Sequence, residues 1–143
     1  MSSQAIEWGG EMPPAFLCAA STVAPPLEWR LVPTSTLELA IVVSDVTGET
    51  PVNHWVVTGL SPETVRLGSL ELPATAAQAV ADSGQLGWSA PCLTEGTTRI
   101  IRFSIYAMRA PSGVVTGTAA ADAVAAIEAQ SISDAFFTAT ITG

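Results

Sequence analysis

The stretch Thr97–Met108 constrains the fold most, because it contains no glycine or proline and alternates its side chains between two faces. One face would carry Arg99, Ile101, Phe103, Ile105 and Ala107, and the other Ile100, Arg102, Ser104, Tyr106 and Met108. Both faces are largely apolar, which is typical of a central strand covered on two sides. We therefore predict a mainly β fold built around this strand.

The same alternation predicts strands at residues 36–44, 52–58 and 136–142, and a short one at 67–72. The period changes over residues 119–129, which lack glycine and proline and predict a helix that Thr118 can cap, with Val124 and Ile127 buried. Glycine and proline predict loops at residues 45–51 and 84–92 and an irregular lead-in over residues 1–15. The length of 143 residues suits a single domain, residues 1–143.

Composition limits the partners of this acidic protein. Hydrophobic residues make up 48% of the chain, yet no apolar run approaches the roughly 20 residues of a membrane-spanning helix. The surplus apolar residues therefore belong to a core, a pocket lining or the interface of a homo-oligomer. A formal charge of −8, with only five Lys and Arg residues, argues against binding nucleic acid.

The first residues and the cysteines bear on the compartment and on metals. Residues 1–8 contain neither a basic segment nor an apolar one, so no signal peptide is visible, and we expect a cytoplasmic protein. Cys18 and Cys92 are too few for a disulfide framework and lack metal-ligand spacing. With His54 as the single histidine, neither a metal site nor a cofactor is expected.

His54 is the first candidate site residue, because it interrupts an apolar, β-branched run. One interpretation is a half-buried histidine with satisfied ring nitrogens, and the other is a functional group that titrates near neutral pH. Arg99 is the second candidate, since a cation on an inward strand face is unusual in so acidic a chain. Arg99 could equally pair with Asp45 or Glu49 at the edge of a sheet.

Several motifs, in this order, resemble the phosphatidylethanolamine-binding protein (PEBP) family, in particular its small bacterial and archaeal members. A run of Phe, Cys-Asp-Gly and Pro-Pro-Leu-x-Trp is matched by Phe16, Cys18-Ala19-Ala20 and Pro25-Pro26-Leu27-Glu28-Trp29. An Asp-Pro-Asp-Ala-Pro loop followed by His-Trp is matched by residues 45–51 and His54-Trp55.

Two later motifs extend the resemblance over nearly the whole chain from Phe16. A Gly-Tyr-x-Gly-Pro-Cys-Pro-Pro loop is echoed by Gly87-Trp88-Ser89-Ala90-Pro91-Cys92-Leu93. A His-Arg-Tyr-x-Phe-x-Leu-Tyr-Ala-Leu strand is echoed by residues 99–108. The resemblance implies a PEBP-like antiparallel β-sandwich with a short helix near the C-terminus.

The resemblance also implies a small anion pocket formed by the aspartate of the first loop, two histidines and the backbone of the Gly-Pro-Cys loop. The positions that correspond to this pocket, or lie beside it, are Asp45, His54, Trp88, Ala90, Pro91, Cys92, Arg99 and Ile101. Several of the family's pocket residues are replaced: the second histidine by Arg99, the tyrosine by Ile101, an aspartate by Ala19, and Pro-Pro by Leu93-Thr94. A pocket rewritten in this way suggests a changed ligand.

Three functions remain open. The first is a binding protein for an amphiphilic ligand with a carboxylate, phosphate or carbonyl group, which Arg99 and His54 would hold. The second is a cofactor-independent isomerase, lyase or cyclase of a biosynthetic pathway, with His54 as general acid or base, Asp45 orienting its ring and Arg99 stabilising an enolate; a nucleophilic cysteine, Cys18 or Cys92, is a variant. The third is a protein-interaction regulator, the role of some eukaryotic relatives known as kinase inhibitors.

Overall fold

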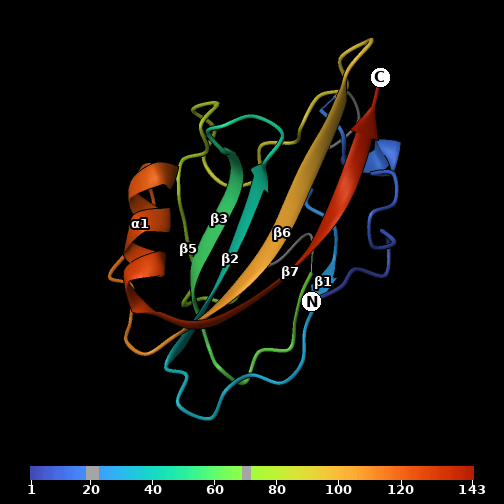
Figure 1. Ribbon diagram of the computed structural model, residues 1–143. Helices are drawn as coiled ribbons and strands as arrows, with labels where there is room; N and C mark the ends of the chain where they lie inside the picture. Colours follow the sequence, from blue (N-terminus) through green and yellow to red (C-terminus); the bar gives the residue numbers. More distant parts are fainter. Residues whose placement is uncertain (19–22, 69–71) are drawn as a thin grey trace.

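A computed structural model describes residues 1–18, 23–68 and 72–143 of the chain (Figure 1). The mainly β architecture is confirmed: one antiparallel sheet has the strand order β5-β3-β2-β6-β7, and β1 pairs with β4 in a second sheet. The elements are η1 (Pro14–Phe16), β1 (Leu27–Glu28), β2 (Glu38–Asp45), β3 (Val52–Leu60), β4 (Arg66–Leu67), β5 (Ala77–Gln78), β6 (Thr98–Met108), α1 (Ala120–Gln130) and β7 (Ser131–Thr142).

The strand covered on both faces is β2, which lies between β3 and β6 and is buried at every position. The prediction that β6 would be covered on both sides is wrong for its first half, where Ile100 is 43% exposed and Arg102 lies on the surface. Its other face is covered, with Ile101 and Phe103 fully buried. The exposure of Ile100 and Arg102 has its cause in the short helix α1. On their face of the sheet, α1 covers only one end (Figure 1).

Two hydrophobic clusters flank the sheet. The larger one joins the strand face of Ile41, Phe103 and Phe137 to β1 and to residues 1–18, the N-terminal segment. The rings of Phe103 and Phe137 stack with their centroids 4.8 Å apart. The smaller one joins the other face to α1 through Ala40, Val42, Val56, Ala79, Met108, Ala120, Ala123 and Ile127. The sheet is therefore the middle layer, with α1 on one face and the N-terminal segment on the other (Figure 1).

The helix and the last strand differ from the prediction in detail. Thr118 does not cap α1, because its hydroxyl donates to the Val115 carbonyl at 2.7 Å, and the N-cap residue Ala119 makes no side-chain bond. Ile127 is fully buried, as expected, whereas Val124 is only half-buried. The strand β7 begins at Ser131, directly after the helix, and not at Phe136. Of the short strand predicted at 67–72, only Leu67 lies in a strand, and residues 69–71 fall outside the described chain.

The lead-in over residues 1–15 runs into the 3-10 turn η1 and covers part of the sheet edge. Glu11 forms a parallel bridge with Thr140 of β7. The backbone N–H groups of Gly9 and Met12 donate to the carbonyls of Thr138 and Thr140 at 2.7 and 2.8 Å. This segment therefore satisfies outward-facing backbone groups near the end of β7.

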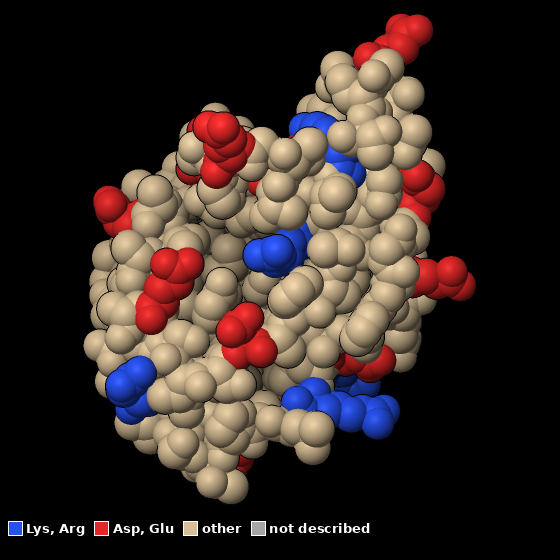
Figure 2. Space-filling view, in the orientation of Figure 1, with Lys and Arg blue, Asp and Glu red and all other residues tan. Residues whose placement is uncertain are grey.

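Charged side chains are sparse on one face of the protein. Figure 2 shows charged side chains sparsely placed over the face of β6, β7 and α1, with broad uncharged areas between them and no continuous basic stripe on this face. Among the described residues, no helix is long and apolar enough to span a membrane.

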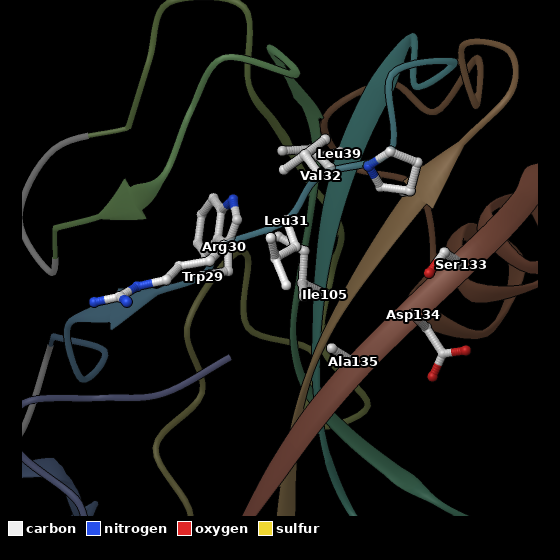
Figure 3. Close-up of a pocket in the computed structure, with 11 residues that line it drawn as sticks. Trp29, Arg30, Leu31, Val32, Leu39, Ile105, Ser133, Asp134 and Ala135 are labelled. Carbon is white, nitrogen blue, oxygen red and sulfur yellow. The ribbon is translucent and has the colours of Figure 1, made fainter.

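A small apolar hollow of about 40 Å³ lies where β2 begins, lined by residues that include Trp29, Leu31, Leu39 and Ile105 (Figure 3). A wider, open hollow of about 840 Å³ shares Trp29, Arg30, Leu31 and Ala135 with it. None of the residues predicted for the functional site lines either hollow.

Substitution of Gly59 in β3 tests how closely this strand packs against the backbone of Thr75. Its φ is +73°, and a Cβ at this position would collide with the backbone carbonyl of Thr75. Gly113 has the same φ but open space around it. We expect Gly113→Ala to lower the free energy of unfolding by about 1 kcal/mol, which is the cost of the backbone conformation alone. Gly59→Ala should cost about 2 kcal/mol more, because the strand must shift. Urea unfolding of both variants measures the difference, and equal losses would contradict the clash.

Candidate functional site

Asp45 is the last residue of β2 and not the first residue of a loop, as the sequence had suggested. Asp45 is 6% exposed, and both oxygens of its carboxylate have partners. Oδ1 accepts the Thr47 backbone N–H at 2.9 Å, and Oδ2 lies 3.3 Å from Nη1 of Arg99. The carboxylate is therefore held in place from both sides.

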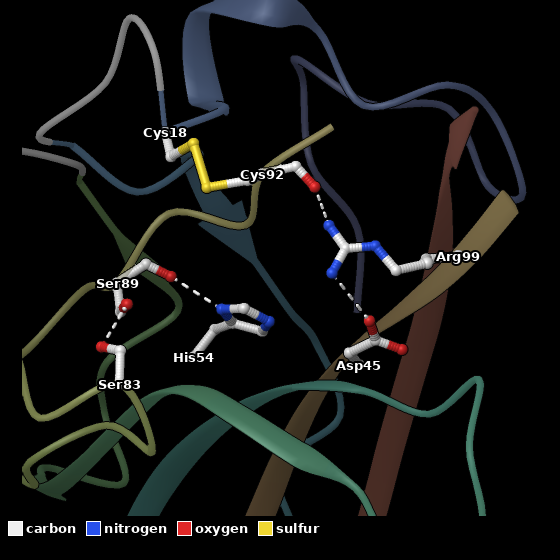
Figure 4. The surroundings of a disulfide bond; sticks show 7 residues. All are labelled: Cys18, Asp45, His54, Ser83, Ser89, Cys92 and Arg99. Atoms are coloured by element: carbon white, nitrogen blue, oxygen red, sulfur yellow. Dashed lines mark hydrogen bonds and ion pairs between the residues drawn. A yellow bond between two sulfur atoms is a disulfide. The ribbon is translucent and has the colours of Figure 1, made fainter. Parts of the chain in front are cut away.

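Arg99 reaches Asp45 from β6 along the shared face of the sheet. Asp45 is directly opposite Ile101 in the β2–β6 register, and Arg99 lies two residues before Ile101 on the same face. The guanidinium also donates through Nη2 to the carbonyl of Cys92 (Figure 4). The expected alternative of an Asp45–Arg99 ion pair is therefore realised, with the Arg99 side chain 25% exposed.

A register irregularity places His54 beside this pair. In the β2–β3 pairing, Val43 is opposite Trp55 but Ser44 is opposite Asn53, so His54 has no partner and is the extra residue of a β-bulge. A bulge turns a side chain away from strict alternation. Strict alternation would place His54 on the face of Val56, and the bulge removes that alternation at this position. Figure 4 shows the imidazole on the same side of the sheet as Asp45 and Arg99.

The ring of His54 is oriented by the loop after β5. Nδ1 lies 2.8 Å from the carbonyl oxygen of Ser89, and the Ser89 N–H donates back to the His54 carbonyl at 2.9 Å. A carbonyl only accepts, so Nδ1 carries the proton and Nε2 of the neutral ring is an acceptor. The enzyme hypothesis had assumed that Asp45 orients the ring. In the structure the orienting partner of Nδ1 is Ser89.

Burial lowers the pKa of His54 below its ordinary value of 6.5. The Ser89 carbonyl and the charge of Asp45 act in the opposite direction, and the charge of Arg99 lowers the pKa further. His54 therefore responds electrostatically to both members of the ion pair. The neutral ring is the stable form at neutral pH.

The two cysteines form a disulfide, so the hypothesis of a nucleophilic cysteine is wrong for this structure. Cys18 and Cys92 are separated by 74 residues, and the bond fastens the loop 88–92 to the end of the N-terminal segment (Figure 4). The Cys18 N–H also donates to the Pro91 carbonyl at 3.0 Å. The cytoplasmic location stays a prediction, and a disulfide is uncommon in reducing compartments.

The remaining predicted residues surround this centre in different ways. Trp88 is 7% exposed and meets Trp55 edge-on at 5.9 Å, while Ile101 is fully buried in the larger cluster. Pro91 is buried, and Ala90 packs against the same cluster. These residues form the apolar surroundings of the site. Ala19, the replaced aspartate of the family, lies outside the described residues.

Sequence reasoning missed Ser89, Ser83 and Thr47. Ser89 holds the imidazole, and the hydroxyls of Ser83 and Ser89 lie 2.7 Å apart. Thr47 holds Asp45 and also accepts the Ile100 N–H at 2.8 Å through its hydroxyl. Ser89 and Thr47 hold His54 and Asp45 through their backbone groups, for which side-chain identity gives no signal.

Three buried side-chain nitrogens around the site have no hydrogen-bond partner: Nε2 of His54, Nε of Arg99 and Nε1 of Trp88. Such unpartnered buried atoms are uncommon in folded proteins, and a hydrogen-bonding ligand would satisfy them. No group of His, Cys, Asp and Glu suited to a metal occurs among the described residues. The free atoms instead offer two N–H donors and one acceptor to an organic or oxyanion ligand.

The phosphatidylethanolamine-binding protein family, compared as a sequence profile, matches residues 2–142. The chain belongs to this family. Among similar proteins, a protein described as the lipoprotein LppC of Mycobacterium tuberculosis is 37% identical over 124 residues, covering 82% of this chain and 60% of LppC. The chain thus spans about 60% of the length of this relative. A UPF0098 protein of Methanothermobacter thermautotrophicus is 28% identical and covers 94% of this chain and 93% of its own.

Solved structures of PEBP relatives confirm the fold. The PEBP homologue CT736 of Chlamydia trachomatis superposes with a TM-score of 0.84 at 25% identity, over 97% of this chain and 94% of the other. YbcL of E. coli, described as a member of the mammalian PEBP family, gives a TM-score of 0.92 at 22% identity, over 99% and 96%. The resemblance inferred from the motifs is therefore confirmed.

The lowered pKa of His54 makes the stability depend on pH. As the pH falls through 6.5, the unfolded chain takes up the proton before the folded chain does, so the free energy of unfolding decreases. Each unit of pKa difference corresponds to about 1.4 kcal/mol. His54→Gln should remove this component. Urea unfolding between about pH 7.5 and pH 5.5, where carboxyl groups stay largely ionised, measures it. A gap between wild type and variant that does not change with pH would contradict the assignment.

Proposed function

We propose that this PEBP-family protein binds an amphiphilic small molecule through His54 and Arg99, with a carboxylate, phosphate or carbonyl group as the recognised part. The observation that carries the proposal is the pair of unpartnered buried nitrogens, Nε2 of His54 and Nε of Arg99, on side chains that lie on one side of the sheet (Figure 4). Ligand oxygens and hydroxyls would satisfy both.

The charges at the site narrow the chemistry of the ligand. Asp45 offsets most of the charge of Arg99, because its carboxylate oxygen lies 3.3 Å from Nη1. A neutral or singly charged ligand therefore suits the site better than a multiply charged anion. Arg99 Nε offers a donor, and neutral His54 offers an acceptor at Nε2. A monoprotonated phosphate ester, a carboxylic acid or a hydroxy-carbonyl group supplies both an acceptor and a donor.

The surroundings favour an apolar part on the ligand. Trp88, Pro91 and Ile101 are buried around the polar centre, and the chain has few cations with which to attract a small inorganic ion. Ligand sites of this kind combine a mainly apolar lining with a small number of placed polar groups.

Butyl phosphate and inorganic phosphate together test the binding site by calorimetry. Butyl phosphate should bind more tightly, because each buried methylene contributes about 0.8 kcal/mol. Arg99→Gln should weaken binding of butyl phosphate about tenfold or more, since a hydrogen bond to a charged group is worth about 1.5–3 kcal/mol. Asp45→Asn combined with Arg99→Gln avoids an unpaired buried carboxylate and should bind equally weakly.

Arg109→Gln is the matched control, because Arg109 donates to the Ser131 carbonyl at the start of β7, away from the site. Its affinity for butyl phosphate should equal that of wild type. Equal affinities of wild type and folded Arg99→Gln would exclude this site as the place of binding.

A second candidate function is a cofactor-independent isomerase, lyase or cyclase that acts beside a carbonyl group. The observation that favours it is the fixed tautomer of His54: Ser89 holds Nδ1–H and leaves the buried Nε2 free to take a proton. Arg99 would stabilise the enolate that forms. In this scheme Ser89, and not Asp45, orients the base.

Hydrogen–deuterium exchange at the carbon beside the carbonyl of a 1,3-diketone, followed by NMR in D₂O, tests this chemistry. Wild type should accelerate the exchange, and His54→Gln should reduce the acceleration by about a hundredfold, the lower range for general base catalysis. Arg109→Gln should keep the wild-type rate. Exchange no faster than in buffer alone would leave the protein as a binder.

A further inference from the structure

The loop 88–92 supplies the backbone carbonyls that hold both polar side chains of the site. Ser89 accepts from His54, and Cys92 accepts from Arg99 (Figure 4). The two halves of this loop are held in place by different interactions. The first half carries the partner of His54, and the second half carries the partner of Arg99.

The first half is held by its own hydrogen bonds. The Ser89 N–H donates to the His54 carbonyl at 2.9 Å, its hydroxyl lies 2.7 Å from that of Ser83, and the Gln85 side chain donates to the Trp88 carbonyl at 2.8 Å. Asp82, just before, accepts the Asn53 N–H at 2.6 Å. His54 therefore keeps its partner without help from the N-terminal segment.

The second half has different attachments. The bonds described for Pro91 and Cys92 are the Cys18 N–H to the Pro91 carbonyl at 3.0 Å, the Arg99 guanidinium to the Cys92 carbonyl, and the disulfide itself. Two residues further on, the Thr94 carbonyl accepts, within the described parts of the chain, from Thr97 of the same turn, from its N–H at 3.2 Å and its hydroxyl at 2.7 Å. The covalent link to Cys18 is thus the main restraint on the carbonyl that Arg99 uses.

We propose that the Cys18–Cys92 disulfide is a positioning element of the site: it fixes the Cys92 carbonyl, which holds the Arg99 guanidinium in its ligand-binding orientation, and a dithiol reductant releases it. The effect of the disulfide on ligand binding rests on the proposed function. Arg99 would then respond to the redox state, whereas His54 would not.

The chemistry is an ordinary thiol–disulfide exchange. Cys18 and Cys92 are both exposed, so a thiolate of the dithiol can attack one of the two sulfurs and form a mixed disulfide. The second thiol of the reductant then displaces the remaining cysteine sulfur. Two electrons and two protons pass to the protein, Cys18 and Cys92 become thiols, and the dithiol becomes a cyclic disulfide.

The test combines the disulfide with Arg99 in a double-mutant cycle, using butyl phosphate as the probe. Cys18→Ser/Cys92→Ser should weaken binding about fivefold, the equivalent of one hydrogen bond of ordinary strength. Arg99→Gln should then weaken binding much less in this background than in wild type, because both changes remove the same interaction. Dithiothreitol should weaken wild type to the level of the serine variant and leave that variant unchanged. Additive effects would overturn the proposal.

Two NMR signals separate this outcome from other failures. His54 is the single histidine, so its ring resonances need no assignment, and they should stay in the Nδ1–H form with a lowered pKa after reduction. An ordinary pKa near 6.5 would show general loosening and overturn the specific role of the disulfide. The Nε–H signal of Arg99, assigned with Arg99→Lys, should exchange faster with water after reduction. If butyl phosphate does not bind at all, the proposed function fails. The Arg99 Nε–H signal then still tests whether the disulfide positions Arg99, and a signal that does not change on reduction rejects that role.

Discussion

The site depends on one irregularity in the pairing of β2 with β3. Both strands are buried around Val43 and Trp55, so regular alternation would direct the side chain between Asn53 and Trp55 to the opposite face of the sheet. The bulge at His54 breaks that alternation and brings the imidazole to the side on which β2 ends in Asp45 and β6 carries Arg99. Three strands thus contribute one polar side chain each, and the regular ladder between β2 and β6 fixes the distance between two of them.

The polar centre is balanced and not strongly charged. Burial of a carboxylate is costly unless it is paired and hydrogen-bonded, and Asp45 has both an ion pair and a backbone donor. The imidazole beside it remains neutral because burial outweighs the attraction of the carboxylate. In the proposed function, such a centre would select ligands by the direction of its donors and acceptors more than by net charge.

The sequence predicted the strands better than it predicted the contacts. Alternation in Glu38–Asp45, Val52–Leu60 and Thr98–Met108 reflects burial directly, and these strands form where expected. The motifs also identified the family, which the match over residues 2–142 confirms. The bulge was not predictable, because Asn53-His54-Trp55 contains no glycine or other local signal for it. The role of Ser89 was not predictable either, because its carbonyl is present in every residue type.

The helix shows a third limit of sequence reasoning. Thr118 has the right chemistry to cap α1, but its hydroxyl bonds to Val115 in the preceding turn, so local competition decided the outcome. The disulfide is similar: two cysteines in a short chain carry no spacing signal, and only the fold brings them together across 74 residues.

The contact of residues 9–12 with β7 has a consequence for the behaviour of the chain in concentrated solution. A sheet margin with free backbone groups is a template on which another molecule can extend the sheet. Here the chain's own early residues occupy the margin at Thr138 and Thr140. This self-coverage leaves fewer free backbone groups for intermolecular strand pairing at the end of the last strand, and it does so with a segment that also closes one side of the hydrophobic interior.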